Sequence, residues 1–243
     1  MKENDGLITQ INPKSYVSEA YRALRTNIQF YNFKNQYKTI LITSSGVREG
    51  KSTVISNLAV SMAQSGSKVL LLDGDFRRPA IYKLFNLNNN KGLSNMLVSE
   101  HQNYRIYIQN TKINNLNIIT SGPIPPNPSE ILGSQAMKDF LEVIKNEYDI
   151  ILIDSPPIDT MTDAAVLSII VDGVILLINS GKVRIDAAKR AKESLQRVNA
   201  NIIGVVMNNV KVEHENYYYY NYYSTGNDLN KKRKRKPEKA KKI

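Results

Sequence analysis

The chain has 243 residues, of which 42% are apolar and 23% are charged, the usual balance of a globular protein. This composition excludes a wholly disordered, collagen-like or coiled-coil chain. The chain has no cysteine, which excludes disulfide scaffolds, iron–sulfur clusters and thiol catalysis. The two histidines, His101 and His214, are too few and too scattered for a zinc site built from histidines.

The net charge of +11 is concentrated at one end of the chain. Residues 231–243 contain nine Lys or Arg and one Glu, so the first 230 residues carry a charge of only +3. Because a block of like charges repels itself, we expect a basic disordered tail over 231–243. The longest apolar run, Val174–Ile178, has five residues, far fewer than the ~20 of a membrane-spanning helix. The first residues lack the apolar stretch of a signal peptide, so we expect a cytoplasmic protein.

Predicted strands and helices alternate along the chain. Residues 1–14 show no periodicity, and we expect a flexible leader there. Apolar periodicity and end signals predict helices over 15–30, 51–64, 129–148, 163–171 and 184–198, with a weaker helical pattern over 93–98. Short apolar runs predict strands over 39–43, 68–72, 116–120, 149–153, 173–178 and 202–207. Residues 122–128 predict an extended loop, after which Ser129 would cap a helix.

Buried strands that alternate with amphipathic helices are typical of a parallel sheet covered by helices on both faces. The predicted fold class is therefore α/β, with a doubly wound, mostly parallel sheet. Ligands of such sheets bind beyond the carboxyl ends of the strands, so functional residues are expected at that edge.

The strand over 39–43 leads into a loop with P-loop spacing, in which Ser45 stands where the usual pattern has glycine. Gly50 allows the backbone to approach an anion, and the amides that begin the next helix point at phosphate oxygens. Lys51 would reach the β- and γ-phosphates of ATP, and the Ser52 hydroxyl would bind Mg²⁺. The residues expected to contact the nucleotide are Gly46, Val47, Arg48, Glu49, Gly50, Lys51, Ser52 and Thr53. The alternative, an ordinary glycine turn, is disfavoured by the strand before the loop and the helix after it.

Two predicted strands end in aspartate at the edge that carries the P-loop. One strand runs into Asp73 and Asp75, and another runs into Asp154. Carboxylates suit a hard cation beside phosphates, and we expect Mg²⁺ to be held by Ser52, Asp75 and Asp154. An acidic pair beside the γ-phosphate can also orient or deprotonate a phenol. The expected catalytic residues are Lys51, Asp73, Asp75 and Asp154. The alternative for the Asp-Gly-Asp sequence is a turn at the end of a strand.

Six of the 14 tyrosines cluster after the last predicted strand. They are Tyr217, Tyr218, Tyr219, Tyr220, Tyr222 and Tyr223. One interpretation is an aromatic patch or an extra edge strand, because tyrosine favours strands. The other is a set of phosphate acceptors, since the segment from Asn208 to the first of these tyrosines can span up to about 30 Å. The cluster could thus reach the catalytic site of its own chain or of a neighbour.

Together, the P-loop, the sequence Asp-Gly-Asp-x-Arg-x-Pro, the sequence Asp-Ser-Pro-Pro and the tyrosine cluster resemble the bacterial tyrosine kinases (BY-kinases). The resemblance is to the separately encoded cytoplasmic kind from capsule and exopolysaccharide operons of Gram-positive bacteria, and it covers about residues 15–223. It implies a P-loop kinase domain over 15–210 and a tyrosine cluster tail over 211–230. It also places Asp73 and Asp75 in a Walker A′ motif, Asp154 in a Walker B motif, and Asn208 near the adenine.

The resemblance further implies an activity and a set of partners. It implies an ATP- and Mg²⁺-dependent kinase that phosphorylates its own tyrosines in trans and regulates capsular or exopolysaccharide synthesis and export. Glu19, Arg22 and Arg25 match the family's oligomerisation motif, which assembles rings; their spacing alone would indicate an exposed stripe of ion pairs. The implied partners are a transmembrane activator of the polysaccharide co-polymerase type and a tyrosine phosphatase. The kinase is therefore expected at the inner face of the plasma membrane.

Two further possibilities stay open for the tail and the function. Residues 231–243 could bind an anionic membrane, at no more than about 1 kcal/mol per Lys or Arg, or could only solubilise the chain. Each phosphotyrosine adds about −1.5 to −2 in charge, so phosphorylation would weaken such membrane contact.

The alternative function is a ParA/MinD-like ATPase, although those P-loops carry a lysine at the position of Gly46. Binding of nucleic acid is disfavoured because the body of the chain is nearly neutral.

Overall fold

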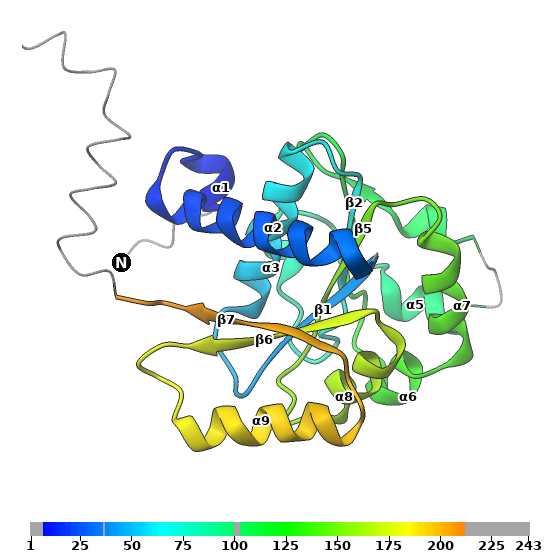
Figure 1. Cartoon of the computed structure of the whole chain (residues 1–243). Helices are drawn as coiled ribbons and strands as arrows, with labels where there is room; N and C mark the ends of the chain where they lie inside the picture. The colour runs from blue at the N-terminus through cyan, green and yellow to red at the C-terminus, as the bar shows by residue number, and fades with distance from the viewer. Residues whose placement is uncertain (1–6, 36, 100–102, 212–243) are drawn as a thin grey trace, which may run out of the picture. The chain divides into compact units, whose positions relative to one another are not determined.

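The computed structural model describes residues 7–35, 37–99 and 103–211. In these residues, seven strands form one sheet in the order β3-β4-β2-β5-β1-β6-β7 (Figure 1). All neighbouring strands are parallel except β3 and β4. The strands are β1 (Thr39–Ser44), β2 (Val69–Asp73), β3 (Gln109–Asn110), β4 (Leu116–Ile119), β5 (Ile150–Asp154), β6 (Gly173–Asn179) and β7 (Ile202–Asn208).

Helices cover both faces of this sheet, which confirms the doubly wound, mostly parallel α/β fold. On one face lie α1 (Ile8–Ile11), α2 (Tyr16–Asn35), α3 (Lys51–Gln64) and α4 (Ile81–Leu84). On the other face lie α5 (Leu93–Val98), a 3₁₀ helix (Tyr104–Tyr107), α6 (Pro128–Leu132), α7 (Gln135–Ile144), α8 (Thr162–Ile170) and α9 (Ile185–Arg197).

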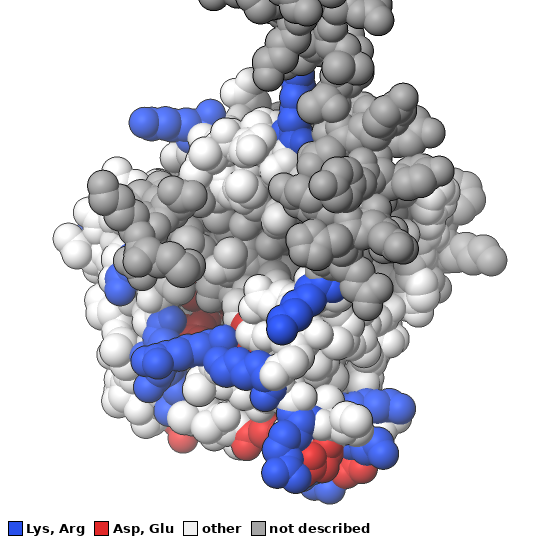
Figure 2. Space-filling view, turned by 90° about the vertical axis from the view of Figure 1, so that its left-hand side faces the viewer, with Lys and Arg blue, Asp and Glu red and all other residues white. Residues whose placement is uncertain are grey.

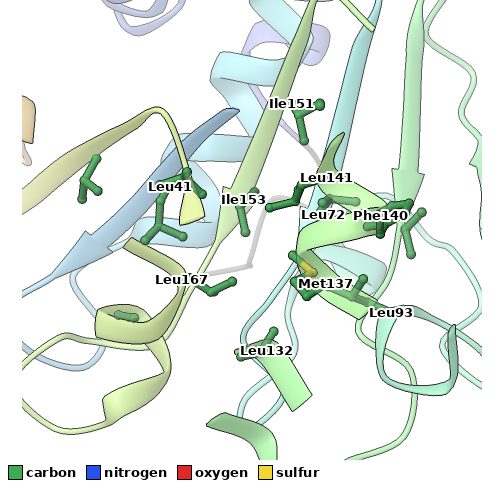
Figure 3. Packing of buried hydrophobic residues seen from close by; sticks show 14 of the residues in the cluster. Leu41, Leu72, Leu93, Leu132, Met137, Phe140, Leu141, Ile151, Ile153 and Leu167 are labelled. Atoms are coloured by element: carbon green, nitrogen blue, oxygen red, sulfur yellow. The ribbon is translucent and has the colours of Figure 1, made fainter. Parts of the chain in front are cut away.

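Alternate residues of the central strands build two hydrophobic cores. Leu41 of β1 and Ile153 of β5 point to the core beneath α5–α8, where Figure 3 shows them near Leu72, Met137 and Leu141. The residues that alternate with these along each strand have side chains on the opposite face of the sheet, where they contact the core beneath α3. Because both faces are buried, the central strands are apolar on both faces through their middle positions, and each fully buried Leu or Ile contributes roughly 1.5–3 kcal/mol.

The expectation of a flexible leader is wrong over residues 7–14. Leu7 is buried, and the chain turns into α1, which packs on α3. The Thr9 backbone N–H and hydroxyl both donate to Asn57 Oδ1, at 3.1 and 2.9 Å. No local pattern reveals this contact, because the partner lies 48 residues further along the chain. Residues 1–6 lie outside the described residues.

The single helix predicted over 129–148 is two helices, α6 and α7. Ser129 lies inside α6 and does not cap it, whereas Ser134 Oγ accepts from Met137 N at 3.3 Å and caps α7. Between the two helices, a Cβ added to Gly133 would lie 2.6 Å from Val166 Cγ1 of α8. The break therefore lets the chain pass close to α8, which a helix with an ordinary side chain at 133 would prevent.

The last strand departs from the expectation that every strand is covered on both faces. Val205 and Met207 of β7 are 58% and 53% exposed. The strand lies at the edge of the sheet, where it pairs only with β6 among the described residues. The other predicted strands agree with the observed ones to within a residue or two, while β3, α4 and the 3₁₀ helix were not predicted.

The order β2-β5-β1 at the centre of the sheet brings the predicted site residues to one edge. Asp73, at the end of β2, is the register partner of Asp154, at the end of β5. Both lie at the carboxyl ends of their strands, as does Ser44, where the P-loop begins. Within the described ranges, we find no helix with the length and apolar character needed to span a membrane.

Candidate active site

The loop from β1 to α3 has the backbone shape of a phosphate-binding loop. Arg48 and Gly50 have positive φ values of 58° and 97°, which curl the chain immediately before the first turn of α3. A Cβ at position 50 would lie 2.5 Å from Asn208 Nδ2, so glycine is required both by the backbone angle and by this close contact. A curled loop at the start of a 14-residue helix presents backbone amides to an anion.

Lys51 begins α3 and is buried, with 7% of its surface exposed. Its ammonium donates a hydrogen bond to Ser44 Oγ at 3.1 Å, and that hydroxyl donates to Gly46 O at 2.7 Å. The lysine is therefore folded back along the loop. A buried ammonium with one hydrogen-bond acceptor has capacity for further acceptors, such as phosphate oxygens.

Glu49 is buried within the loop, where its carboxylate accepts hydrogen bonds from the loop and from the neighbouring strand. It accepts hydrogen bonds from Ser45 Oγ at 2.6 Å, from Gly46 N, and from Asn179 N of β6 at 3.1 Å. The backbone oxygen of Glu49 accepts from Asn208 Nδ2 at 2.8 Å. The Glu49 side chain thus connects the start of the P-loop to β6, and the Asn208 side chain connects the end of the P-loop to β7. The sequence pattern had indicated only nucleotide contact for these positions.

Ser52 and Asp154 meet at the centre of the site. The Ser52 hydroxyl donates to Asp154 Oδ2, and Asp154 is fully buried. Burial raises the pKa of Asp154 to about 7; Lys51 and the Ser52 hydroxyl oppose this shift, and the charge of Asp75 adds to it. The other carboxylate oxygen, Oδ1, is buried without a hydrogen-bond partner in the described part of the chain. An unpaired buried carboxylate oxygen beside a hydroxyl is a donor set that fits a hard cation such as Mg²⁺.

Asp73 and Asp75 have different surroundings, although they stand two residues apart. Fully buried Asp73 accepts from the N–H groups of Ala80 and Ile81, at 3.3 and 3.2 Å, so it holds the loop that follows β2. Burial, together with the charge of Asp154, raises its pKa well above the usual value. Asp75 accepts from Arg78 N at 2.9 Å. In the described ranges, no cluster of three or more Asp, Glu, His or Cys residues has metal-binding geometry, so a metal here would need Ser52 and other oxygens.

An ion pair that the sequence analysis missed anchors the same loop. Arg77 forms a bidentate pair with Asp163 of α8, with Nε–Oδ2 at 2.8 Å and Nη2–Oδ1 at 3.0 Å. Asp163 is fully buried. The hydrogen bond to Asp163 outweighs the effect of burial and raises the pKa of Arg77. No local signal could have found this pair, because its members are 86 residues apart.

The residues expected to mediate oligomerisation do not form one uniform stripe. Glu19 and Arg22 form an exposed ion pair at 2.6 Å, and Arg22 also donates to Pro13 O at 2.8 Å. Arg25 instead points to α3, where it donates to Ser61 O at 2.9 Å, and its Nε is buried without a partner in the described residues. The tyrosines of 217–223 and the basic residues 231–243 lie outside the described residues.

Figure 2 shows the face towards which β6 and β7 run, with Lys and Arg side chains gathered around a small acidic recess. Lys182 is one basic residue beside the P-loop, because its ammonium donates to Arg48 O at 3.2 Å. Arg184 follows it at the start of α9 and is largely exposed. Basic side chains beside the P-loop favour the approach of anionic ligands.

Comparisons with known proteins agree with this geometry. The matching family model is ParA, described as NUBPL iron-transfer P-loop NTPase, over residues 35–235. CapB of Staphylococcus aureus is 41% identical over 210 residues, which cover 86% of this chain and 92% of CapB. The tyrosine-protein kinase YwqD of Bacillus subtilis (strain 168) is 41% identical over 215 residues, which cover 88% of this chain and 90% of YwqD. The solved structure of the chimerical protein CapA2B2 has a TM-score of 0.81 and 40% identity, covering 85% of this chain and 90% of that one.

The iron chemistry in the description of the family model does not carry over, because this chain has no cysteine to bind iron–sulfur clusters. The resemblance to BY-kinases noted from the motifs is confirmed by two relatives at 41% identity over most of their lengths. The chain therefore belongs to the bacterial tyrosine-protein kinases of the CapB and YwqD type, which share the ParA form of the P-loop NTPase fold.

Proposed function

We propose that the chain transfers the γ-phosphoryl group of ATP to tyrosine hydroxyls, and that its own cluster at 217–223 is the main acceptor. The observation that carries this proposal is the meeting of Ser52 with buried Asp154 beside Lys51. These are the groups that a P-loop uses to hold a nucleotide and its cation. The kinase relatives at 41% identity support tyrosine as the acceptor.

Each residue at the edge of the sheet has a role in this proposal. The amides at the start of α3 and the Lys51 ammonium bind the phosphates. Ser52 and Asp154 would hold Mg²⁺, which, when bound, supplies positive charge against the phosphate oxygens. Asp75, whose carboxylate accepts a hydrogen bond from Arg78 N, accepts the proton of the attacking phenol. Asp73 keeps the loop that carries Asp75 in place through the amides of Ala80 and Ile81.

We further propose that acceptor tyrosines reach a neighbouring subunit of a ring-shaped homo-oligomer, with Glu19, Arg22 and Arg25 at the interface. A transmembrane activator of the polysaccharide co-polymerase type would hold the kinase at the inner face of the membrane, and a tyrosine phosphatase would reverse the reaction. Residues 231–243 would add contact with anionic lipid. The output would be regulation of capsular or exopolysaccharide synthesis and export. The similarity to the CapA2B2 chimera supports a partner chain of this kind.

Incubation with ATP labelled at the γ-phosphate tests the proposal. We expect label on tyrosine in the unmodified protein, loss of this label in Lys51→Met, and full labelling in the control Lys138→Met, whose lysine is exposed on α7. The alternative is a ParA/MinD-like ATPase, which the family model favours in part. Release of phosphate without label on tyrosine would support that ATPase and contradict the kinase.

A further inference from the structure

A proline-rich loop follows β4 and has no role in the site described above. Residues 121–128 have the sequence Ser-Gly-Pro-Ile-Pro-Pro-Asn-Pro. Pro123, Ile124 and Pro126 are exposed, and 66% of the Ile124 surface is accessible, whereas Pro128, which begins α6, is buried. The exposed part of this segment, which we call the proline loop (residues 123–126), therefore presents an apolar surface to solvent.

Hydrogen bonds from two other segments of the chain fix the backbone where the proline loop begins. The Gly122 N–H donates to Asn89 Oδ1 at 3.0 Å, and Asn89 Nδ2 donates to Gly122 O at 3.1 Å. Ser94 Oγ of α5 donates to Pro123 O at 2.7 Å. Within the loop, each proline restricts its own φ to about −65°. The apolar surface is thus largely preorganised, so a ligand that binds it loses little free energy in ordering the loop.

The sheet places the proline loop on one side of the predicted catalytic carboxylates. The register pairs Leu72 of β2 with Ile119 of β4, so the segment that carries Asp75 and the segment after β4 leave neighbouring strands at the same edge. Neighbouring strands lie ~4.8 Å apart, so the end of β4 is about 10 Å from the end of β5, where Asp154 lies. A nucleotide held by the P-loop would lie on the β1 side of Asp154. The β4 side is left for the acceptor.

The chemistry of the proline loop matches the sequence around the proposed acceptors. Proline-rich segments and aromatic side chains bind each other at many peptide-recognition sites. An extended chain advances ~3.3 Å per residue, so a side chain two or three positions from the acceptor lies about 7–10 Å away, the distance from β5 to β4. Six tyrosines lie within residues 217–223, and each of them has another tyrosine two or three positions away.

We propose that the proline loop binds an aromatic side chain two or three positions from the acceptor tyrosine, with Ile124 as the main contact. The proposal rests on the proposed function for tyrosine transfer and adds a substrate preference, which is for tyrosines in aromatic clusters over isolated tyrosines. The acceptor segment comes from another copy of the chain or from a protein with the same pattern. Each tyrosine of a cluster then serves both as an acceptor and as a binding group for its neighbours.

The same contact makes an expectation for the course of the reaction. A phosphate group gives the tyrosine side chain a charge of about −1.5 to −2. An apolar surface binds such a group poorly, because the charge would lose its hydration. Phosphorylation of the neighbours therefore removes the binding groups of the tyrosines that remain, and the last tyrosine of a cluster should react more slowly than the first.

Peptide kinetics with the full-length enzyme test the proposal. The enzyme carries serine in place of its six tail tyrosines, so that only the added peptide is labelled from ATP. Two peptides contain residues 213–226 with Tyr220 as the single tyrosine, and the other five tyrosines are phenylalanine in one peptide and serine in the other. The phenylalanines keep the rings but cannot accept phosphate. We expect the KM of the serine peptide to be about tenfold higher, with an equal kcat at saturating peptide.

Variants of the proline loop connect this preference to Ile124. Ile124→Asp should raise the KM of the phenylalanine peptide about tenfold and leave that of the serine peptide unchanged, whereas Ile124→Leu should keep the preference. The matched control is Ile169→Asp, because Ile169 is 62% exposed and lies in the last turn of α8, near the opposite edge of the sheet. Calorimetric affinity for Mg²⁺-ATP should be the same in all variants, which reports an intact P-loop.

The outcomes separate this proposal from the proposed function. Equal KM values for the two peptides, or equal losses for both peptides in Ile124→Asp, would overturn the role of the proline loop while tyrosine labelling still supports the kinase. A loss of Mg²⁺-ATP affinity in Ile124→Asp would also overturn it, because the loop would then act through the nucleotide site. Label on neither peptide, nor on the tyrosines of the unmodified chain, would refute the kinase and the role of the loop together.

Discussion

Replacement of Arg77 by methionine should destabilise the domain, because it leaves the buried carboxylate of Asp163 without its partner. Removal of one member of a buried ion pair costs roughly 3–5 kcal/mol. Asp163 has no exposed surface, but the Arg77 side chain is 35% exposed, so water can partly replace the guanidinium. We therefore expect a loss at the lower end of that range, ~3 kcal/mol. In a domain of this size, that loss lowers the melting temperature by roughly 6–12 °C.

Urea unfolding and thermal melts of Arg77→Met, Asp163→Asn and the double variant measure this loss. In the double variant neither member of the pair is charged, so no buried charge is left without a partner. Its loss in free energy of unfolding should therefore be smaller than the sum of the two single losses by about 2 kcal/mol. Arg184→Met is the matched control, because Arg184 and its partner Asp186 are 85% and 56% exposed, and such pairs contribute only about 0–1 kcal/mol. The reasoning is refuted if Arg77→Met destabilises the protein no more than Arg184→Met does.

Three further predictions concern single positions. Asp154→Asn should raise the melting temperature of the nucleotide-free protein, because a buried carboxylate with an unpaired oxygen is removed, and should abolish tyrosine labelling. Asp172→Asn should lower stability at pH 7: burial would raise the pKa of Asp172, but the N–H groups of Thr39 and Lys38 outweigh burial and hold it below the usual value. That stability is present at neutral pH and is lost as the pH falls through the lowered pKa, so the melting temperatures of the two proteins should converge only in acid, below the ordinary pKa of aspartate. Gly50→Ala places a side chain at φ 97°, which should cost about 1–2 kcal/mol and weaken binding of Mg²⁺-tripolyphosphate.

Most of the sheet could be predicted because its central strands are buried on both faces and therefore appear in the sequence as short, continuous apolar runs. The helix over 51–64 could be predicted because glycines at positions 50 and 66 bound it. Prediction failed where the decisive contact is distant in sequence. The break at Gly133 depends on Val166, and the folding of the leader over residues 7–14 depends on Asn57. A glycine in a helical pattern and a short polar leader carry no local sign of such partners.

The candidate site divides in the same way. The P-loop and the strand-end aspartates are contiguous patterns with a known geometry, so spacing alone indicated where Lys51, Ser52 and Asp154 would meet. The inward turn of Glu49 towards Asn179 and the pairing of Arg77 with Asp163 required the fold. Both contacts involve charged side chains in loops, and from the sequence pattern alone such side chains would be expected at the surface. The residues that hold the site in shape were thus less predictable than the residues that form it.

The two rims of the sheet restrict how copies of this protein can associate. At one rim, β3 has only two residues and runs antiparallel, so it offers too short a ladder for another strand. At the other rim, β7 is seven residues long, and its outer side is unpaired among the described residues. Strand-to-strand contact between copies would join β7 to β7 about a twofold axis and would stop at a dimer. A closed ring of several subunits would therefore have to be built through surfaces other than the strand edges and not by continuing the sheet from one subunit to the next.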